Sequence, residues 1–359
     1  MKILITRTDK LGDLVLSIPV FEYLRGAIPE LEIHALVAPI SVPLLENNPH
    51  LAGIWTWDEA DSQDTLLRLE NRLRGEGFDA AIMLQYRREL AQLLRRAGIG
   101  RRHGPWSRLS SWFLLNKGTW QGRSHSNLHE MEQNLHLARH FLGRRAQGVD
   151  FPQPTLYLTE GQRDVGSEFR SDFVVGSDKV VFVHPGSGGS ALDWAPSRFA
   201  VVANTLASMD GFRVFITGAA GDASRVTQVS AGLDQDVAVL LDRYNLRDFL
   251  GVLSAGDYFV GPSTGPLHLA AALGLGTVGL YPPVPTMSPG RWGPRGVFTQ
   301  TVVPAVDCPA RRLCSMERCP HYNCMDGVYE RDVLGAVMEV HRLKTEAPLA
   351  GDVVQEEES

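Results

Sequence analysis

The sequence predicts an α/β protein made of two doubly wound domains that face each other across a cleft. Short apolar runs alternate with helical patterns in both halves of the chain, as parallel βαβ units require. At 359 residues the chain is long enough for two cores, and a Pro- and charge-rich stretch at 148–179 separates the halves. We therefore expect an N-terminal domain over 1–165, a C-terminal domain over 175–345 and a disordered acidic tail over 346–359.

Each expected strand is a short apolar run bounded by polar or turn residues. The first half has such runs at 2–6, 32–38, 53–57 and 79–84, and the second half at 179–185, 212–218, 237–241, 257–261 and 277–281. Apolar residues at helical spacing predict helices over 13–25 and 196–207. Ligands of doubly wound sheets bind at the carboxyl ends of the strands, so the loops after these runs are the candidate sites.

Composition excludes several classes of protein. The net charge of −6 provides no broad positive field, so we expect no nucleic-acid binding. The N-terminus lacks a signal-peptide pattern, and no uncharged apolar run is long enough to span a bilayer. We therefore expect a cytoplasmic protein.

The segment YFVGPSTGPLHLAAALG (258–274) predicts an anion site. A strand ends at Gly261, Ser263, Thr264 and Gly265 form a turn, and a helix with His268 in its first turn follows. Free amides and the helix dipole at such a turn suit a diphosphate. The alternative is that Thr264 is an ordinary N-cap and His268 a structural histidine.

A second candidate loop is rich in glycine and serine. It follows the strand at 179–185 and contains Gly186, Ser187, Gly188, Gly189 and Ser190. Its exposed amides could surround an anion, although a flexible connection would have the same composition. Because both loops follow strands of one sheet, we expect them to converge on one ligand.

The first loop of the chain, in TRTDKLGDLVLSIP (6–19), carries a carboxylate where phosphate loops carry glycines. It has one glycine, Gly12, followed by Asp13. By itself the pattern allows Asp13 to be a helix N-cap or a functional acid.

Together these segments resemble glycosyltransferase family 9, the ADP-heptose:lipopolysaccharide heptosyltransferases. The other matching pieces are NLRDFLGVLSAG and GLYPPVPTMSPGRWGPRG. The resemblance implies a GT-B fold, with the acceptor on the N-terminal domain and the nucleotide sugar on the C-terminal one. It also implies an inverting transfer that needs no metal or other cofactor for catalysis. On this resemblance Asp13 is the general base, and the residues 186–190 and 263–265 with His268 bind the donor.

Two positions depart from the family pattern. Ser263 stands where the family often has Asp, and Asp193 precedes Trp194 where the family often has Lys or Arg. The second departure removes a charge that could neutralise phosphate. ADP-heptose is therefore the family default for the donor, and the residues themselves do not specify it.

An arginine-rich stretch suggests the acceptor side. Seven arginines lie between residues 87 and 108, and the Trp-rich segment 105–120 follows. Arginine suits phosphates and Trp-rich amphipathic pieces suit membrane interfaces, so we expect a glycolipid or saccharide acceptor and peripheral contact with the inner leaflet. The candidate acceptor residues are Arg7, Lys10, Gly12, Arg95 and Arg96. The alternative is a solvated helix face followed by a helix that packs on the core.

All four cysteines lie within residues 308–324. Cys308, Cys314, Cys319 and Cys324 could surround one structural Zn²⁺ or Fe ion. The alternatives are reduced thiols or disulfides in a loop.

The leading hypothesis is an inverting glycosyltransferase that moves a heptose-like sugar from a nucleotide diphosphate to an envelope glycolipid or saccharide. The same fold could act on a protein or a small metabolite. A protein of another class, a non-catalytic nucleotide- or saccharide-binding module, would fit the departures at Ser263 and Asp193.

Overall fold

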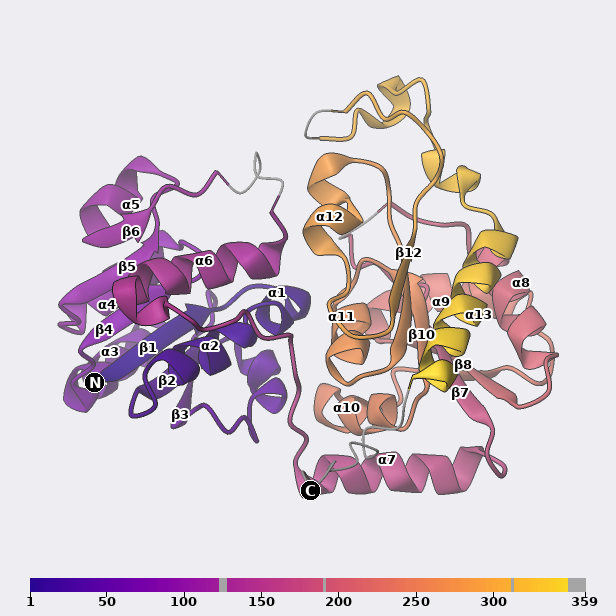
Figure 1. Ribbon diagram of the computed structural model, residues 1–359, viewed down its shortest axis with the longest axis horizontal. Helices are drawn as coiled ribbons and strands as arrows, with labels where there is room; N and C mark the ends of the chain where they lie inside the picture. The colour runs from indigo at the N-terminus through magenta and orange to yellow at the C-terminus, as the bar shows by residue number, and fades with distance from the viewer. Residues whose placement is uncertain (123–127, 190–191, 311–312, 348–359) are drawn as a thin grey trace, which may run out of the picture.

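The computed structural model describes residues 1–122, 128–189, 192–310 and 313–347, and it contains two parallel six-stranded sheets (Figure 1). The strand orders are β3-β2-β1-β4-β5-β6 and β12-β11-β10-β7-β8-β9. The predicted two-domain α/β architecture is therefore confirmed. The acidic tail expected at 346–359 lies outside the described residues from 348 onward.

The N-terminal sheet is flanked by helices on both faces. Its strands are β1 (Lys2–Arg7), β2 (Glu32–Val37), β3 (Gly53–Thr56), β4 (Ala80–Met83), β5 (Arg101–Pro105) and β6 (Lys117–Thr119). Its helices are α1 (Leu11–Val15), α2 (Pro19–Ala27), α3 (Gln63–Glu76), α4 (Arg88–Arg96), α5 (Leu109–Leu114) and α6 (Glu130–Leu142), with a 3₁₀ turn at Pro39–Leu44. The helix predicted over 13–25 is divided in two, because Pro19 begins α2 and has no N–H to continue the preceding turn.

The C-terminal sheet repeats the plan. Its strands are β7 (Lys179–Val183), β8 (Phe212–Gly218), β9 (Ala238–Leu241), β10 (Tyr258–Pro262), β11 (Gly276–Leu280) and β12 (Thr299–Val302). Its helices are α8 (Pro196–Ala207), α9 (Ala223–Ser230), α10 (Leu246–Ser254), α11 (Gly265–Ala272), α12 (Pro289–Trp292) and α13 (Glu330–Glu346). Val333, Val337 and Val340 of α13 are buried in the core of this domain.

The stretch expected as a linker contains a helix of the second domain. α7 (Glu160–Phe173) begins with a capping box at Thr159 and packs against α10, below the C-terminal sheet in Figure 1. The contact is close: a Cβ on Gly166 would lie 2.6 Å from the Gly251 carbonyl oxygen. The predicted end of the first domain at 165 therefore cuts through α7, and we propose a boundary before this helix.

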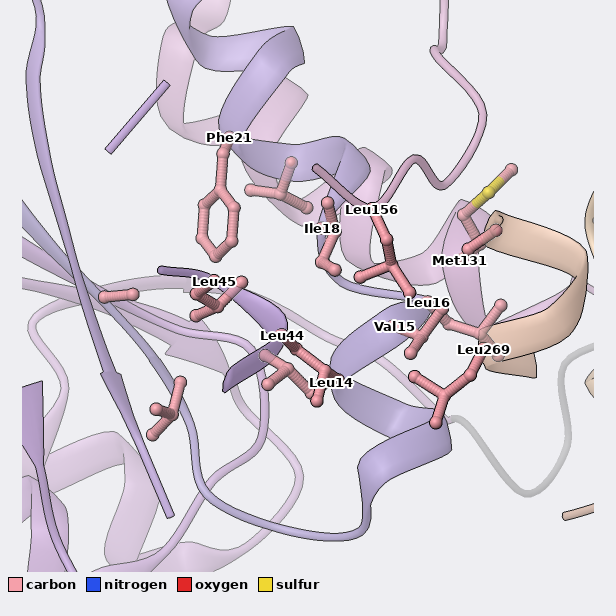
Figure 2. Close-up of a cluster of buried hydrophobic side chains, with 14 of the residues drawn as sticks. Leu14, Val15, Leu16, Ile18, Phe21, Leu44, Leu45, Met131, Leu156 and Leu269 are labelled. Atoms are coloured by element: carbon pink, nitrogen blue, oxygen red, sulfur yellow. The ribbon is translucent and has the colours of Figure 1, made fainter. Parts of the chain in front are cut away.

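The two domains meet along an apolar contact next to the first loop. Figure 2 shows Leu14, Val15 and Leu16 near Leu269 of α11 and Met131 of α6, all within one buried cluster. This contact fixes the position of α1 relative to α11, and hence of the first loop relative to the helix of the predicted donor site.

Candidate active site

Asp13 lies in the first turn of α1 but does not cap it. The N-cap residue is Lys10, and the Asp13 carboxylate accepts a hydrogen bond from Arg7 Nη2 at 2.5 Å. The N-cap alternative for Asp13 is therefore wrong. The side chain is 16% exposed, so it borders solvent while most of it is enclosed.

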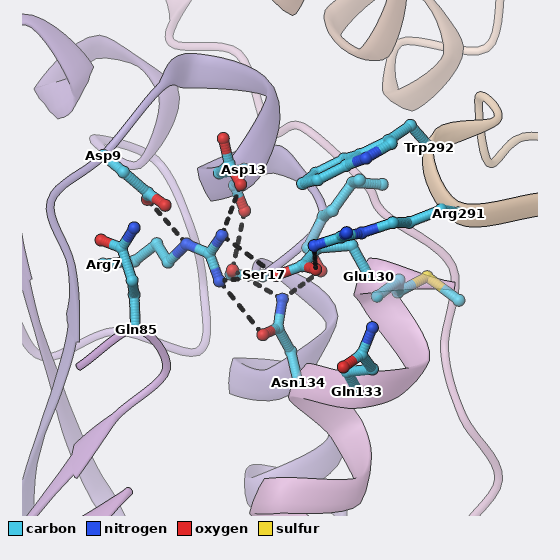
Figure 3. Close-up of polar contacts among 12 residues, drawn as sticks. Arg7, Asp9, Asp13, Ser17, Gln85, Glu130, Gln133, Asn134, Arg291 and Trp292 are labelled. Atoms are coloured by element: carbon cyan, nitrogen blue, oxygen red, sulfur yellow. Dashed lines mark hydrogen bonds and ion pairs between the residues drawn. The ribbon is translucent and has the colours of Figure 1, made fainter. Parts of the chain in front are cut away.

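Arg7 links several groups around Asp13 (Figure 3). Its Nε donates to Asp9 at 2.7 Å, and its Nη atoms reach Glu130 at 3.2 Å and the Asn134 side-chain oxygen at 3.2 Å. The guanidinium is only 3% exposed. Since these partners occupy it, we interpret Arg7 as the residue that holds Asp13 in place, whereas the sequence suggested an acceptor contact.

Three carboxylates surround this one guanidinium, and this excess of negative charge affects Asp13. The pKa of Asp13 is raised to about 6, chiefly by burial and also by the nearby Asp9 and Glu130 carboxylates, against the opposing effect of Arg7. A carboxylate with a pKa near neutral pH, in the helix turn that follows a strand and partly open to solvent, is suited to accept a proton.

The C-terminal domain contributes to the same cluster. Arg291 of α12 lies 3.7 Å from the second oxygen of Glu130, and Trp292 lies beside it in Figure 3. Two further contacts join the same segments: Arg295 with Glu132 at 2.9 Å, and His129 Nε2 donating to the Gly293 carbonyl at 2.9 Å. The charged network around Asp13 therefore spans both domains.

The predicted diphosphate turn lies directly against the Asp13 loop. A Cβ on Gly12 would lie 2.8 Å from His268 Cδ2, and a Cβ on Gly265 would lie 3.2 Å from Leu11 Cβ. The structure thus brings together Gly12, Asp13, Gly265 and His268, which the sequence placed at separate sites. Ser263 and Thr264 are also buried here, with Thr264 as the N-cap residue of α11.

His268 is a neutral histidine in this setting. Burial, with a smaller effect from the neighbouring His129, lowers its pKa to about 3. Its Nδ1 is buried and has no hydrogen-bond partner among the described residues. His268 can therefore contribute a neutral hydrogen bond to a ligand, but no positive charge.

The glycine-rich loop after β7 lies beside the start of α9. Gly188 and Gly189 have φ of 52° and 71°, which favour glycine, and a Cβ on Gly186 would lie 2.1 Å from Asp222 Oδ1. The predicted residue Ser190 lies outside the described residues. His184 precedes the loop and is held by Thr217 at 3.0 Å; burial lowers its pKa to about 4.

Two of the predicted acceptor residues lie at the wrong edge of the sheet. Arg95 and Arg96 end α4 just before β5 begins, at the amino edge, whereas Asp13 follows the carboxyl end of β1. Arg96 pairs with Glu70 of α3 at 2.8 Å. Of the seven arginines, those at the carboxyl edge are Arg87 and Arg88, at the start of α4, and Arg108, which follows β5. The predicted residue Lys10 is exposed in the Asp13 loop.

The four cysteines line one cavity of about 480 Å³ but do not form a ligand set. Burial, followed by the proximity of the other three thiols, raises the pKa of Cys324. All four are free, and the described residues contain no group of three or more His, Cys, Asp or Glu side chains placed to hold an ion. The geometry therefore gives no support to the predicted Zn²⁺ or Fe.

Some residues of the site were not predicted from the sequence. Glu130 and Asn134 lie one turn apart on α6, in a region without a recognisable motif. Arg291 and Trp292 lie in GRWGPRG, a segment that the family resemblance included without assigning it a role. The spacing of Glu130 and Asn134 on one helix face was an available signal.

Comparison with known proteins identifies the family of the chain. Residues 66–315 match the model of glycosyltransferase family 9 (heptosyltransferase). A Haemophilus influenzae protein named as a glycosyltransferase without a stated substrate is 31% identical over 82% of this chain and 86% of its own length. The lipopolysaccharide core heptosyltransferase OpsX of the same organism is 24% identical over 77% of this chain and 78% of its own.

The fold also matches a solved structure. Escherichia coli ADP-heptose LPS heptosyltransferase II superposes with a TM-score of 0.77 at 23% identity, covering 97% of this chain and all of that one. The predicted GT-B fold and the family resemblance are thereby confirmed.

Proposed function

Since the chain belongs to glycosyltransferase family 9 and is therefore a glycosyltransferase, we propose that it transfers a heptose-like sugar, with inversion, from a nucleoside diphosphate to a lipopolysaccharide-core saccharide. The observation that carries the mechanism is the position of Asp13. It is a partly exposed carboxylate with a raised pKa, and its loop touches the helix that begins at Gly265.

Asp13 is the proposed general base. An acceptor hydroxyl attacks the anomeric carbon on the face opposite the diphosphate and passes its proton to Asp13 as the new bond forms. A positioned base of this kind contributes about 10²–10⁴-fold in rate. Arg7 holds the carboxylate. Asn134 donates a hydrogen bond to Ser17 Oγ at 3.0 Å, and Ser17 Oγ donates to the Asp13 carbonyl at 2.8 Å.

The leaving diphosphate is stabilised from the C-terminal domain in this proposal. Amides at the start of α11 and in the loop 186–189 can donate to the developing negative charge, and the neutral His268 can add one hydrogen bond. ADP-heptose is the proposed donor because E. coli heptosyltransferase II is named for it and the fold is shared. The mechanism requires no metal or cofactor, since side chains and amides supply each role.

An exposed aromatic surface supports contact with a membrane. Four large apolar side chains are 59–84% exposed: Leu109, Trp112 and Phe113 on α5, and Trp120 just after β6. α5 follows the carboxyl end of β5. Arg108 is exposed next to them. No helix in the described part of the chain has the length and apolar character to cross a bilayer. We propose that this surface contacts the anionic inner leaflet, where a lipid-linked acceptor would be presented.

The four-cysteine segment retains a separate proposal of a structural Zn²⁺ or Fe ion. It rests only on the thiol-rich composition, because thiolates are preferred ligands of both ions. Elemental analysis of the full chain, purified without added metal, tests it: less than about 0.1 ion per chain refutes the proposal.

The decisive experiment for the function offers several nucleotide sugars with and without a lipopolysaccharide-core acceptor. We expect acceptor-dependent release of ADP from ADP-heptose and a β-to-α or α-to-β change at the anomeric carbon. Release that depends on a protein or small-metabolite acceptor would redirect the function to that acceptor class. No release with any donor and acceptor would refute the proposal.

A further inference from the structure

A cavity of about 320 Å³ lies between the glycine-rich loop and α9. Ser187, Gly188 and Gly189 form one side, and Asp222, Ser224, Arg225 and Gln228 form the other. Among the described residues that line it, Arg225 carries the only positive charge. Sequence comparison with the family pattern suggested that this region lacks a phosphate-neutralising side chain, because Asp193 stands at the position before Trp194.

Arg225 is held in place by that same Asp193. Arg225 Nη2 forms an ion pair with Asp193 Oδ2, and Nη1 donates to the Trp194 carbonyl at 3.3 Å. The other Asp193 oxygen accepts a hydrogen bond from Ser187 Oγ at 3.1 Å. Asp193 therefore connects the guanidinium to the glycine-rich loop and neutralises its charge.

We propose that Arg225 is the residue that binds the donor's diphosphate, and that Asp193 is an internal anion that the diphosphate displaces. The proposal rests on the proposed function, in that the donor is a nucleoside diphosphate sugar. One guanidinium can donate two parallel hydrogen bonds to phosphate oxygens. A diphosphate is therefore a stronger partner than a single carboxylate.

The difference in exposure favours this exchange. The Asp193 side chain is 54% exposed, whereas that of Arg225 is 24% exposed. Asp193 can therefore move into water with little desolvation penalty, while Arg225 stays at the cavity wall. The positive charge that the family often has before the tryptophan is thus supplied from α9, and the carboxylate at 193 competes with the donor for it.

Binding of ADP and of adenosine to the full chain, measured by calorimetry, tests the exchange. Arg225→Gln is expected to weaken ADP binding about tenfold to hundredfold, because a charge-assisted hydrogen bond is lost, and to leave adenosine binding unchanged. Asp193→Asn is expected to strengthen ADP binding in the wild-type background and to have no effect on it in Arg225→Gln. Arg213→Gln, in β8 and outside the cavity lining, is the matched control for loss of one charge.

The outcomes separate the two proposals. If the wild type binds ADP and Arg225→Gln binds it equally well, the assignment of Arg225 is wrong and the proposed function stands. Equal weakening of ADP and adenosine by Arg225→Gln also overturns the assignment, since the effect would then be loss of pocket shape. If the wild type binds no nucleoside diphosphate, the proposed function fails, and this inference fails with it.

Discussion

Replacing Asp13 by Asn should make folding stability less dependent on pH. In the folded chain burial raises the pKa of Asp13 from 3.8 to about 6, so the fold favours the protonated form. This favourable contribution is complete below the unfolded pKa and is lost as pH rises through about 6. A shift of about two pKa units makes this contribution to the unfolding free energy about 3 kcal/mol in total. About half of it has been lost at pH 5, and all of it above about pH 7.

The assay is urea unfolding of the wild type and Asp13→Asn at pH 5 and pH 8. The amide cannot ionise, so the difference in unfolding free energy between variant and wild type should shift in favour of the variant by about 1–2 kcal/mol from pH 5 to pH 8. The Arg7 ion pair exists only when Asp13 is ionised, and its effect is already included in the pKa of about 6 from which this difference follows. A shift near zero, or of opposite sign, would refute the argument that Asp13 is a buried acid with a raised pKa.

Three further predictions concern neighbouring features. Gly12→Ala should lose about 1–3 kcal/mol of unfolding free energy in urea denaturation, because its Cβ would lie 2.8 Å from His268 Cδ2. In the same assay the control Gly75→Ala in α3, which has open space around it, should be neutral or stabilising. Glu130→Gln should lower the pKa of Asp13, because it removes one of the carboxylates that raise this pKa. The acid limb of the pH–rate profile should then shift to lower pH. An unchanged limb contradicts the role of Glu130. Trp112→Ser with Phe113→Ser should abolish flotation with anionic liposomes, whereas Leu67→Ser should retain it, because Leu67 is an exposed apolar residue of α3 outside the aromatic surface. Equal flotation of both variants would exclude the aromatic surface.

The strands with apolar sequences were predictable, and those without them were not. The runs at 2–6, 32–38 and 212–218 match β1, β2 and β8 to within one residue at each end, because parallel strands buried on both faces are continuous apolar segments. β5, with the sequence RRHGP, and β6, with KGT, have no such pattern. They are strands because a neighbouring strand supplies their hydrogen bonds, which only the tertiary structure defines.

The polar surface of α7 explains why the sequence placed the domain boundary within this helix, whereas we propose a boundary before it. Its exposed positions are charged residues, serines and one glycine, and only Gln162, Gly166 and Phe169 are buried. In the sequence, a helix with so few buried positions resembles a linker. Only the structure shows the close contact of Gly166 with Gly251 on α10.

Asp13 and the donor loops could be found from local motifs, because each lies directly after a strand. The groups that tune Asp13 could not, since Glu130 is 123 residues from Arg7 in the sequence and Arg291 is in the other domain. For the same reason Arg225, thirty-two positions after Asp193, restores a charge that the local sequence lacks. Residues that act through a shared ion pair become visible only when the fold brings them together.

The pH dependence of kcat/KM for heptose transfer to a lipopolysaccharide-core acceptor tests the central claim most directly. If Asp13 accepts the acceptor proton, the wild-type rate should rise with pH through an apparent pKa of about 6 as the carboxylate ionises. Asp13→Asn should be at least about 10²-fold slower and should lack this limb. A folded Asp13→Asn enzyme with near-normal turnover and the same limb would contradict the assignment of Asp13 as the base.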